Sequence, residues 1–175
     1  MQIETLEAGE KSPAFREITL EDAKPFIGKW HRAGRPAIGR FCFGAFQNGE
    51  MIAASVIVDS RGHHPRVGEI MCMAKNPAYD TFQMSKFLKH ICKAIRGYYD
   101  FIVSFCLNVR GRGAMFQGAY WNYDGIFKVG NYTLWGDRLE RTDIGNHLYW
   151  KAITDLGTER ASIYGLRSMP YPRVI

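Results

Sequence analysis

The feature that most constrains the fold is an amphipathic segment that leads into a short apolar run. Between Phe82 and Ile95, apolar residues recur at the three- and four-residue spacing of a helix, and Gly97 is expected to end that helix. Residues 100–107 (DFIVSFCL) follow as an almost continuous apolar run, which is typical of a central strand buried on both faces. Another strand is expected at residues 66–74, so these segments predict a strand–helix–strand unit.

A hairpin is expected before this unit. Residues 40–46 and 51–58 are strand-like, and Asn48-Gly49 between them accepts the positive φ angles that a tight hairpin turn needs. The remaining expected elements are a strand at 15–20, a helix from Asp22 toward His31, a short helix at 114–121 and strand-like pieces at 125–129, 131–135 and 148–153. This order predicts an α/β (α+β) domain over residues 14–175, with a mixed sheet flanked by helices, behind a loose leader at 1–13.

The charge distribution indicates a polyanionic partner. The chain has 175 residues and a net charge of +6. Residues 1–22 hold six acids and two bases, a balance of −4, whereas the other 153 residues hold 21 bases and 11 acids, a balance of +10. A basic body suits nucleic acid, and the alternative is a basic protein kept soluble by its charge. No apolar run approaches a membrane span, and no signal peptide or membrane partner is expected.

The four cysteines predict free thiols. Cys42, Cys72, Cys92 and Cys106 form no C-x-x-C pair, and each lies among apolar residues. A zinc site or a disulfide framework is therefore not expected, and the reducing cytoplasm is the expected compartment.

One stretch resembles the signature of the Mom family of phage DNA-modification proteins. The residues that carry it are Ser104-Phe105-Cys106 and the run from Gly113 to Gly125 (GAMFQGAYWNYDG). The segment 29–36 (KWHRAGRP) is similar to that family's early histidine segment, and residues 69–85 match more loosely. This resemblance implies a GNAT-like acyltransferase fold, whose mixed central sheet is splayed and flanked by helices.

The resemblance also implies a reaction. Mom-like proteins add a carbamoylmethyl group to adenine N6 in duplex DNA, which blocks restriction enzymes, so the implied setting is a phage protein in the cytoplasm of a bacterial host. A target amine inside the base stack has to be flipped out of the duplex. Iron has been linked to the family's site, but only His31 matches such a ligand here, so no metal is expected. The group donor stays unknown at this stage.

Five residues are candidates for catalysis. His31 titrates near neutral pH, and Asp124 can accept a proton from an amine. Ser104 would line the point where the sheet opens, and Asn108 follows the end of the same strand, where open α/β sheets bind ligands. Tyr123 belongs to an aromatic cluster with Asp124. The alternatives are structural roles: a helix-end histidine, a core serine and an aromatic core cap in which Asp124-Gly125 is a turn.

Other residues are candidates for holding DNA. Tyr120 and Trp121 could stack on an extruded base, and the glycine-flanked arginines 110 and 112 could approach a phosphate. The alternative for the charged residues is a solvated surface. The full set of expected DNA contacts is Arg32, Arg35, Arg40, Lys86, Lys89, Lys93, Arg110 and Arg112.

Two other functions remain open. The first is an acyl-CoA-dependent N-acyltransferase acting on a small molecule or protein, although residues 76–83 (NPAYDTFQ) contain no glycine to bring the backbone close to a pyrophosphate, which disfavours acetyl-CoA. The second is a non-catalytic nucleic-acid-binding module.

Overall fold

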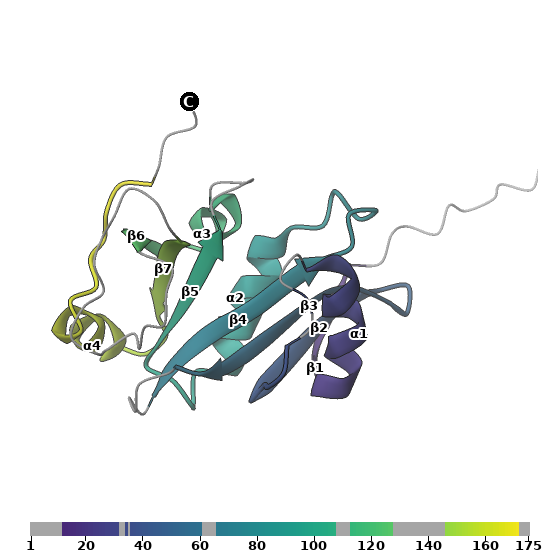
Figure 1. Ribbon diagram of the computed structural model, residues 1–175, viewed down its shortest axis with the longest axis horizontal. Coiled ribbons are helices and arrows are strands. Elements are labelled where there is room, and N and C mark those ends of the chain that lie inside the picture. Colours follow the sequence, from purple (N-terminus) through teal and green to yellow (C-terminus); the bar gives the residue numbers. More distant parts are fainter. Residues whose placement is uncertain are drawn as a thin grey trace, which may run out of the picture.

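The computed structural model describes residues 12–31, 34, 36–60, 66–107, 113–127 and 146–171. The leader at 1–11, the end of the strand expected at 125–129 and the strand expected at 131–135 lie outside these residues. Within them, the chain forms a seven-stranded mixed sheet with helices on both faces (Figure 1). The elements are β1 (Ala14–Ile18), α1 (Leu20–Trp30), β2 (Phe41–Gln47), β3 (Glu50–Asp59), β4 (Val67–Lys75), α2 (Met84–Ala94), β5 (Phe101–Leu107), α3 (Ala114–Gly118), β6 (Asn122–Phe127), β7 (Asn146–Ala152) and α4 (Gly157–Ile163).

The strand order is β1-β2-β3-β4-β5-β7-β6, and only the β4–β5 pair is parallel. The expected hairpin is confirmed, since Asn48 and Gly49 turn between β2 and β3 with φ angles of 51° and 84°. The strand–helix–strand unit is confirmed as β4-α2-β5, and the prediction of a mixed α/β fold is correct.

Several boundaries differ from the expectation. Helix α1 begins at Leu20 because Thr19 caps it: the Thr19 hydroxyl accepts the backbone N–H of Asp22, while the Asp22 carboxylate accepts the N–H of Thr19. Strand β6 begins at Asn122, three residues earlier than expected. Helix α4 was not expected at all, since its seven residues are too few for a helical repeat of apolar residues to stand out.

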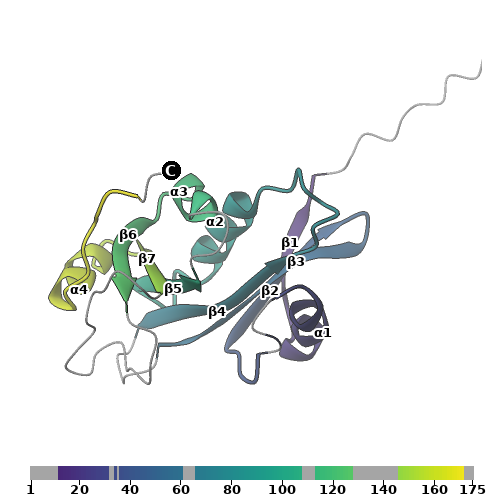
Figure 2. The same ribbon diagram turned by 45° about the horizontal axis from the view of Figure 1, so that its top comes forward.

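The helices lie on opposite faces of the sheet. Figure 2 shows α2 and α3 on one side and α1 on the other. On the α2/α3 face, Phe87, Leu88 and Ile91 of α2 pack on the sheet. On the other face, Ala23 and Ile27 of α1 cover β2 to β4, and Ala161 of α4 packs against β5 and β7.

The sheet splits between its two parallel strands. Residues Val67–Ile70 of β4 pair with Phe101–Ser104 of β5, and the pairing ends there. Beyond this point, among the described strands, β4 continues to Lys75 paired with β3, while β5 continues to Leu107 paired with β7. The two strands diverge, as Figure 1 shows. We call this opening the fork. A β-bulge lies beside it, because Met71 of β4 has no partner on β3.

The closed end of the fork is held by Asp100, whose side chain is 3% exposed. Its carboxylate accepts two hydrogen bonds from Arg66, of 2.9 and 3.0 Å, and one of 3.0 Å from the hydroxyl of Thr154. It also pairs with Arg160 of α4. The hydrogen bonds of Arg66, ahead of the other cationic and hydroxyl partners, hold the Asp100 pKa below its usual value. We call this group of four residues the Asp100 clamp.

We expect Asp100→Asn to destabilise the protein by about 3 kcal/mol, the lower limit for breaking a buried ion pair, because both arginines are partly exposed and can be rehydrated. The lowered pKa of Asp100 means that the ionised carboxylate contributes stability above the ordinary carboxyl range, and that this contribution is lost as the pH falls through the lowered pKa. Urea unfolding at pH 7 should therefore separate the variant from the wild type, and the gap should narrow below about pH 4. The matched control is Glu21→Gln, at the exposed pair with Lys24, where a loss of about 1 kcal/mol or less is expected. Equal losses in both variants would contradict the clamp.

Candidate active site

Ser104 lies at the vertex of the fork. It is the last residue of β5 that pairs with β4, and it is 3% exposed. Ile102, two residues earlier, packs on the α2/α3 face, so the alternation of the strand places Ser104 on that face too. The expectation that Ser104 marks the point where the sheet opens is confirmed. Burial raises the pKa of the neighbouring Cys106 thiol to about 11, and a hydrogen bond with Ser104 opposes that rise.

An aromatic wall flanks the fork on the same face. Its members are Phe116 of α3, Tyr123 of β6, Tyr149 of β7 and Tyr171 of the C-terminal segment. Tyr149 lies opposite Ser104 in the sheet and stacks on Phe116 with 4.4 Å between ring centroids. Tyr123 and Tyr171 each lie within 6.0 Å of Tyr149, measured between ring centroids. Burial raises the pKa of all three tyrosines, so their hydroxyls stay protonated and can donate hydrogen bonds.

Gly113 fits tightly against this wall. It begins α3 with a φ of 74°, and a Cβ atom built on it would lie 2.4 Å from the Tyr149 hydroxyl oxygen. Glycine is required there both for the left-handed backbone and for the close approach. The packing thus fixes the position of the Tyr149 hydroxyl beside α3.

His147 was not identified as a candidate from the sequence. It lies on β7 opposite Cys106 and is 3% exposed. Its ring centroid lies 5.5 Å from that of Tyr123 and 6.4 Å from that of Tyr149, with the ring planes nearly parallel. Among the residues that the structure describes, neither ring nitrogen finds a hydrogen-bond partner. Leaving such a buried polar group unpaired costs about 1–3 kcal/mol. The sequence offered one signal for His147. It precedes Leu148 in a strand-like stretch, and residues two apart in a strand share a face, which places His147 with Tyr149 on the α2/α3 side.

Asp124 corrects an expectation. Its carboxylate is fully buried and accepts a 2.8 Å hydrogen bond from the backbone N–H of Arg167. It occupies a bulge, since the register with β7 shifts between Tyr123 and Gly125. The Trp150 indole N–H donates a second hydrogen bond to the same C-terminal segment, residues 166–171, at the carbonyl of Arg167. Asp124 therefore has a structural role in fastening residues 166–171 to β6, although Asp124-Gly125 lies within the strand and is not the turn named as the alternative.

The two aromatic candidates for base stacking separate. Trp121 is 3% exposed and packs on Phe116 in the core, so it cannot stack on a base, and this expectation is corrected. Tyr120 is 74% exposed. The Lys89 amine lies 4.5 Å from the centre of its ring, and the Lys151 amine donates to its carbonyl.

His31 lies apart from Ser104. It caps the C-terminus of α1, which covers the face opposite to α2 and α3, and burial lowers its pKa. His31, Ser104 and Asp124 were all expected to take part in catalysis, and the structure separates them: Ser104 projects from one face, His31 ends a helix on the other, and Asp124 is enclosed.

The expected DNA contacts also divide. Lys86, Lys89 and Lys93 are exposed on α2, as expected. Arg40 instead pairs with Asp59 and lies over the rings of Phe41, Tyr98 and Tyr99. Four other expected DNA contacts and the catalytic candidate Asn108 lie outside the described residues; the four are Arg32, Arg35, Arg110 and Arg112.

Metal and membrane signals are weak. The described residues contain no group of three or more His, Cys, Asp or Glu side chains that could hold a metal ion, so no step through iron is derived. All four cysteines are free, as predicted. Among the helices that the structure describes, none has the length and apolar composition needed to span a membrane.

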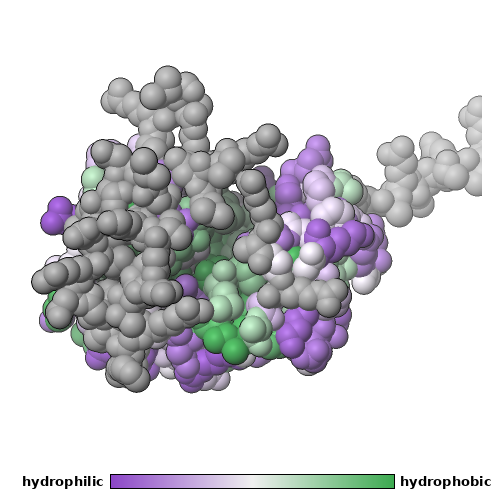
Figure 3. All heavy atoms as spheres, in the orientation of Figure 1, coloured by the Kyte–Doolittle hydropathy of each residue, from purple (hydrophilic) through white to green (hydrophobic). Residues whose placement is uncertain are grey.

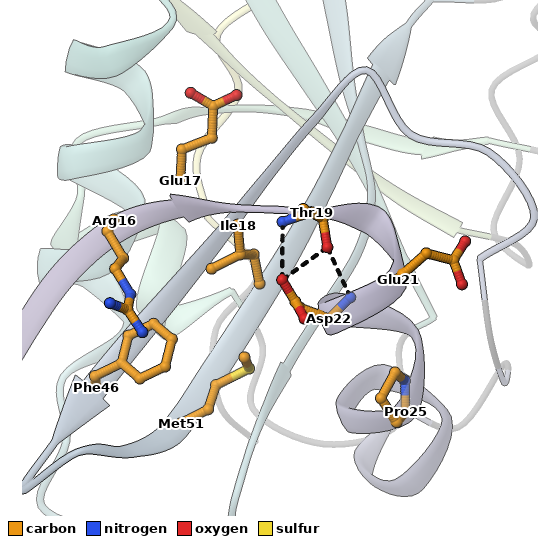
Figure 4. A pocket seen from close by; sticks show the side chains of 9 residues that line it. All are labelled: Arg16, Glu17, Ile18, Thr19, Glu21, Asp22, Pro25, Phe46 and Met51. Carbon is orange, nitrogen blue, oxygen red and sulfur yellow. Dashed lines mark hydrogen bonds between the residues drawn. The ribbon is translucent and has the colours of Figure 1, made fainter.

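A separate pocket lies between β1 and the first turn of α1 (Figure 4). Its polar groups are already engaged, since Asp22 belongs to the Thr19 cap and the Arg16 guanidinium lies 4.0 Å from the centre of the Phe46 ring. Figure 3 shows the face of the sheet that carries α1 and α4 in Figure 1, with apolar residues near its centre; α2 and α3 lie on the opposite face. Because Ser104 and the aromatic wall meet where β4 and β5 part, we place the candidate active site at the fork, on the α2/α3 face.

Comparison with known proteins supports the fold. No family model and no curated protein matches the sequence. Among solved structures, a GNAT-family acetyltransferase from Streptococcus pneumoniae has a TM-score of 0.58 at 14% identity, covering 82% of this chain and 100% of that one. The ribosomal-protein-S18-alanine N-acetyltransferase of Escherichia coli gives 0.57 at 14%, with coverages of 82% and 95%. A GNAT-family acetyltransferase from Elizabethkingia anophelis with acetyl-CoA bound gives 0.53 at 17%, with coverages of 80% and 97%. The chain has the GNAT acetyltransferase fold.

We expect Asp124→Ala to lower the free energy of unfolding by about 1–3 kcal/mol, because it removes a buried carboxylate and leaves the backbone N–H of Arg167 without its acceptor. Limited proteolysis should then cut residues 166–171 faster than in the wild type. The control is Asn122→Ala, which removes only an exposed hydrogen bond from Ser168 to the same strand and should cost about 0.5 kcal/mol or less. Wild-type stability in Asp124→Ala would restore the catalytic interpretation of this residue.

Proposed function

We propose that the protein is an acyltransferase that moves an acyl group from a CoA thioester to an amine. The observation that carries this proposal is the fork, which frees one edge of β4 beside a buried hydroxyl and an aromatic wall. Acetyl-CoA was disfavoured above because no glycine precedes α2; the geometry of the fork outweighs that objection.

The free edge of β4 suits the donor. Residues 71–75 continue past the last pairing with β5, and the bulge at Met71 lies where the two strands part. An extended molecule that carries amide groups can add to such an edge as an extra strand. The pantetheine arm of CoA has this chemistry, and its thioester end would then point toward Ser104.

The end of the donor that carries phosphates would lie near the start of α2. This helix follows the carboxyl end of β4, so its first turn is at the open end of the fork. Gln83 makes no capping hydrogen bond, and the first turn carries no acidic side chain. The N–H of Lys86 donates to the carbonyl of Gln83, so the N–H groups ahead of it in this turn are the ones that can meet an anion.

We expect acetyl-CoA to bind the wild type with measurable heat in calorimetry. Slow hydrolysis of the bound thioester should then release the thiol of CoA. Ser104→Ala should bind acetyl-CoA with unchanged affinity but release thiol about 10-fold or more slowly, because a hydroxyl aimed at the thioester is worth a charge-assisted hydrogen bond in the transition state. Ser55→Ala is the matched control: Ser55 is also fully buried, but its hydroxyl donates to the carbonyl of Cys72 on the neighbouring strand. The absence of acetyl-CoA binding would overturn the proposed donor.

We propose as a second candidate that the acceptor amine is adenine N6 of DNA, with the carbamoylmethyl product that the Mom-like resemblance implies. The specific observation is the basic, aromatic surface beside the fork. Helix α2 exposes Lys86, Lys89 and Lys93 and contains no acidic residue. Lys89 and Lys151 both contact the exposed Tyr120. Lysines beside an aromatic ring suit phosphates flanking an unstacked base.

The backbone at Tyr120 supports a binding role for its ring. Helix α3 ends in a Schellman motif, in which the N–H of Trp121 donates to Phe116 and that of Tyr120 to Gln117. Tyr120 occupies the left-handed position, with φ at 58°, where glycine is preferred. An exposed tyrosine there does not help the helix to end, so its ring has another use.

We expect Tyr120→Gly to fold at least as stably as the wild type, since glycine favours this backbone, yet to bind nucleic acid about 10-fold more weakly because a stacked base loses its platform. Fluorescence anisotropy with labelled duplex and single-stranded oligonucleotides at 50 and 200 mM KCl measures this. Lys89→Ala should reduce the salt slope by about 1, whereas Lys29→Ala on α1 should leave it unchanged. Unaltered affinity in Tyr120→Gly would remove the support for this acceptor.

A further inference from the structure

His147 is placed beside the fork by the register of three strands. It lies opposite Cys106 of β5, while Tyr149, two residues further on, lies opposite Ser104. Because β5 runs from the closed end of the fork toward the open end, His147 is one side-chain pair nearer the opening than Ser104. Its ring contacts with Tyr123 and Tyr149 place it on the α2/α3 face, the same face as Ser104.

The chemistry of His147 is that of a neutral base without a partner. The side chain is 3% exposed, and within the described part of the chain both Nδ1 and Nε2 lack a hydrogen bond. Burial lowers its pKa, so the imidazole is neutral at pH 7 and presents one N–H and one lone pair. A histidine that served only the core would have its nitrogens satisfied by backbone or side chains.

The groups that face His147 leave its lone pair free for a substrate. On β5 the facing group is the Cys106 thiol, on β6 the Tyr123 hydroxyl, on β7 the Tyr149 hydroxyl, and on the C-terminal segment, next to both tyrosines, the Tyr171 hydroxyl. Burial raises the pKa of each of the four, so all are uncharged at pH 7. The Tyr171 hydroxyl donates to the carbonyl of Trp121. No carboxylate is among these facing groups, so the imidazole is not tied into an ion pair.

We propose that His147 is the general base of acyl transfer, which rests on the proposed function. The amine nitrogen attacks the thioester carbonyl carbon, a C–N bond forms, and the C–S bond breaks with its electron pair leaving on sulfur. The imidazole lone pair takes the proton that the nitrogen loses, and the imidazolium passes it to the thiolate. The products are an amide and a free thiol, and His147 returns to its neutral form.

The test uses the full chain with acetyl-CoA as the probe and water as the acceptor, and follows thiol release from pH 5 to 9. In the wild type, kcat should rise with pH through a midpoint below 6.5 and then level off, because the base acts only when it is deprotonated. In His147→Gln, kcat should no longer rise with pH over this range and should be about 100-fold lower than in the wild type. Its KM for acetyl-CoA should stay within twofold of the wild-type value. His147→Asn serves if the glutamine variant does not fold.

The matched control is His90→Gln. His90 is also partly buried with a lowered pKa, but it lies on α2 against Phe15 and Phe43, on the β1–β2 side of the sheet. Its variant should keep the wild-type pH profile. Thiol release with an unchanged profile in both His147 variants, or a wild-type midpoint at or above 6.5, would overturn the role of His147 and leave acyl transfer standing. No thiol release from the wild type, with no binding of acetyl-CoA, would overturn both.

Discussion

The Asp100 clamp is the interaction on which the rest of the structure depends. The parallel contact between β4 and β5 is only four residues long, and a short parallel pairing is weakly held by its own hydrogen bonds. Asp100 precedes β5 and binds Arg66, which precedes β4, so one carboxylate fixes the register of both strands. Through Arg160 and Thr154 it also fixes α4 and the end of β7. Because one end is held by charge, the other end can open without loss of the sheet.

The two ends of the fork differ in how their buried polar groups are satisfied. At the closed end, the Asp100 carboxylate accepts hydrogen bonds from several donors. The backbone carbonyl of Asp100 accepts the N–H groups of Ile153 and Thr154. Toward the open end, neither nitrogen of His147 has a hydrogen-bond partner among the described residues. A fold tolerates unsatisfied buried groups where a ligand completes them, so this contrast assigns structure to one end and chemistry to the other.

Local elements could be predicted from the sequence, and long-range ones could not. The Asn48-Gly49 turn and the helical stripe of α2 are set by neighbours within a few residues, so their patterns were sufficient. The fork depends on which strand lies beside β4 and on where the pairing stops, and both follow from the clamp between residues 34 positions apart. Likewise, Asp124 looked catalytic because its partner Arg167 is 43 residues away.

The same reasoning explains which site residues could be found. A hydroxyl inside an apolar strand stands out, so Ser104 was identified and its place at the fork was anticipated. His147 lies on a strand that begins after a stretch without clear periodicity, and its alternation with Leu148 is too short to reveal which face it joins. Only the pairing of β7 with β5 brings this histidine next to the fork. The candidate site combines Ser104 of β5, a strand that the sequence predicts, with His147 of β7, a strand that it predicts poorly. Because the two strands are brought together only by their pairing, such a site is recognised from the order of strands in the sheet.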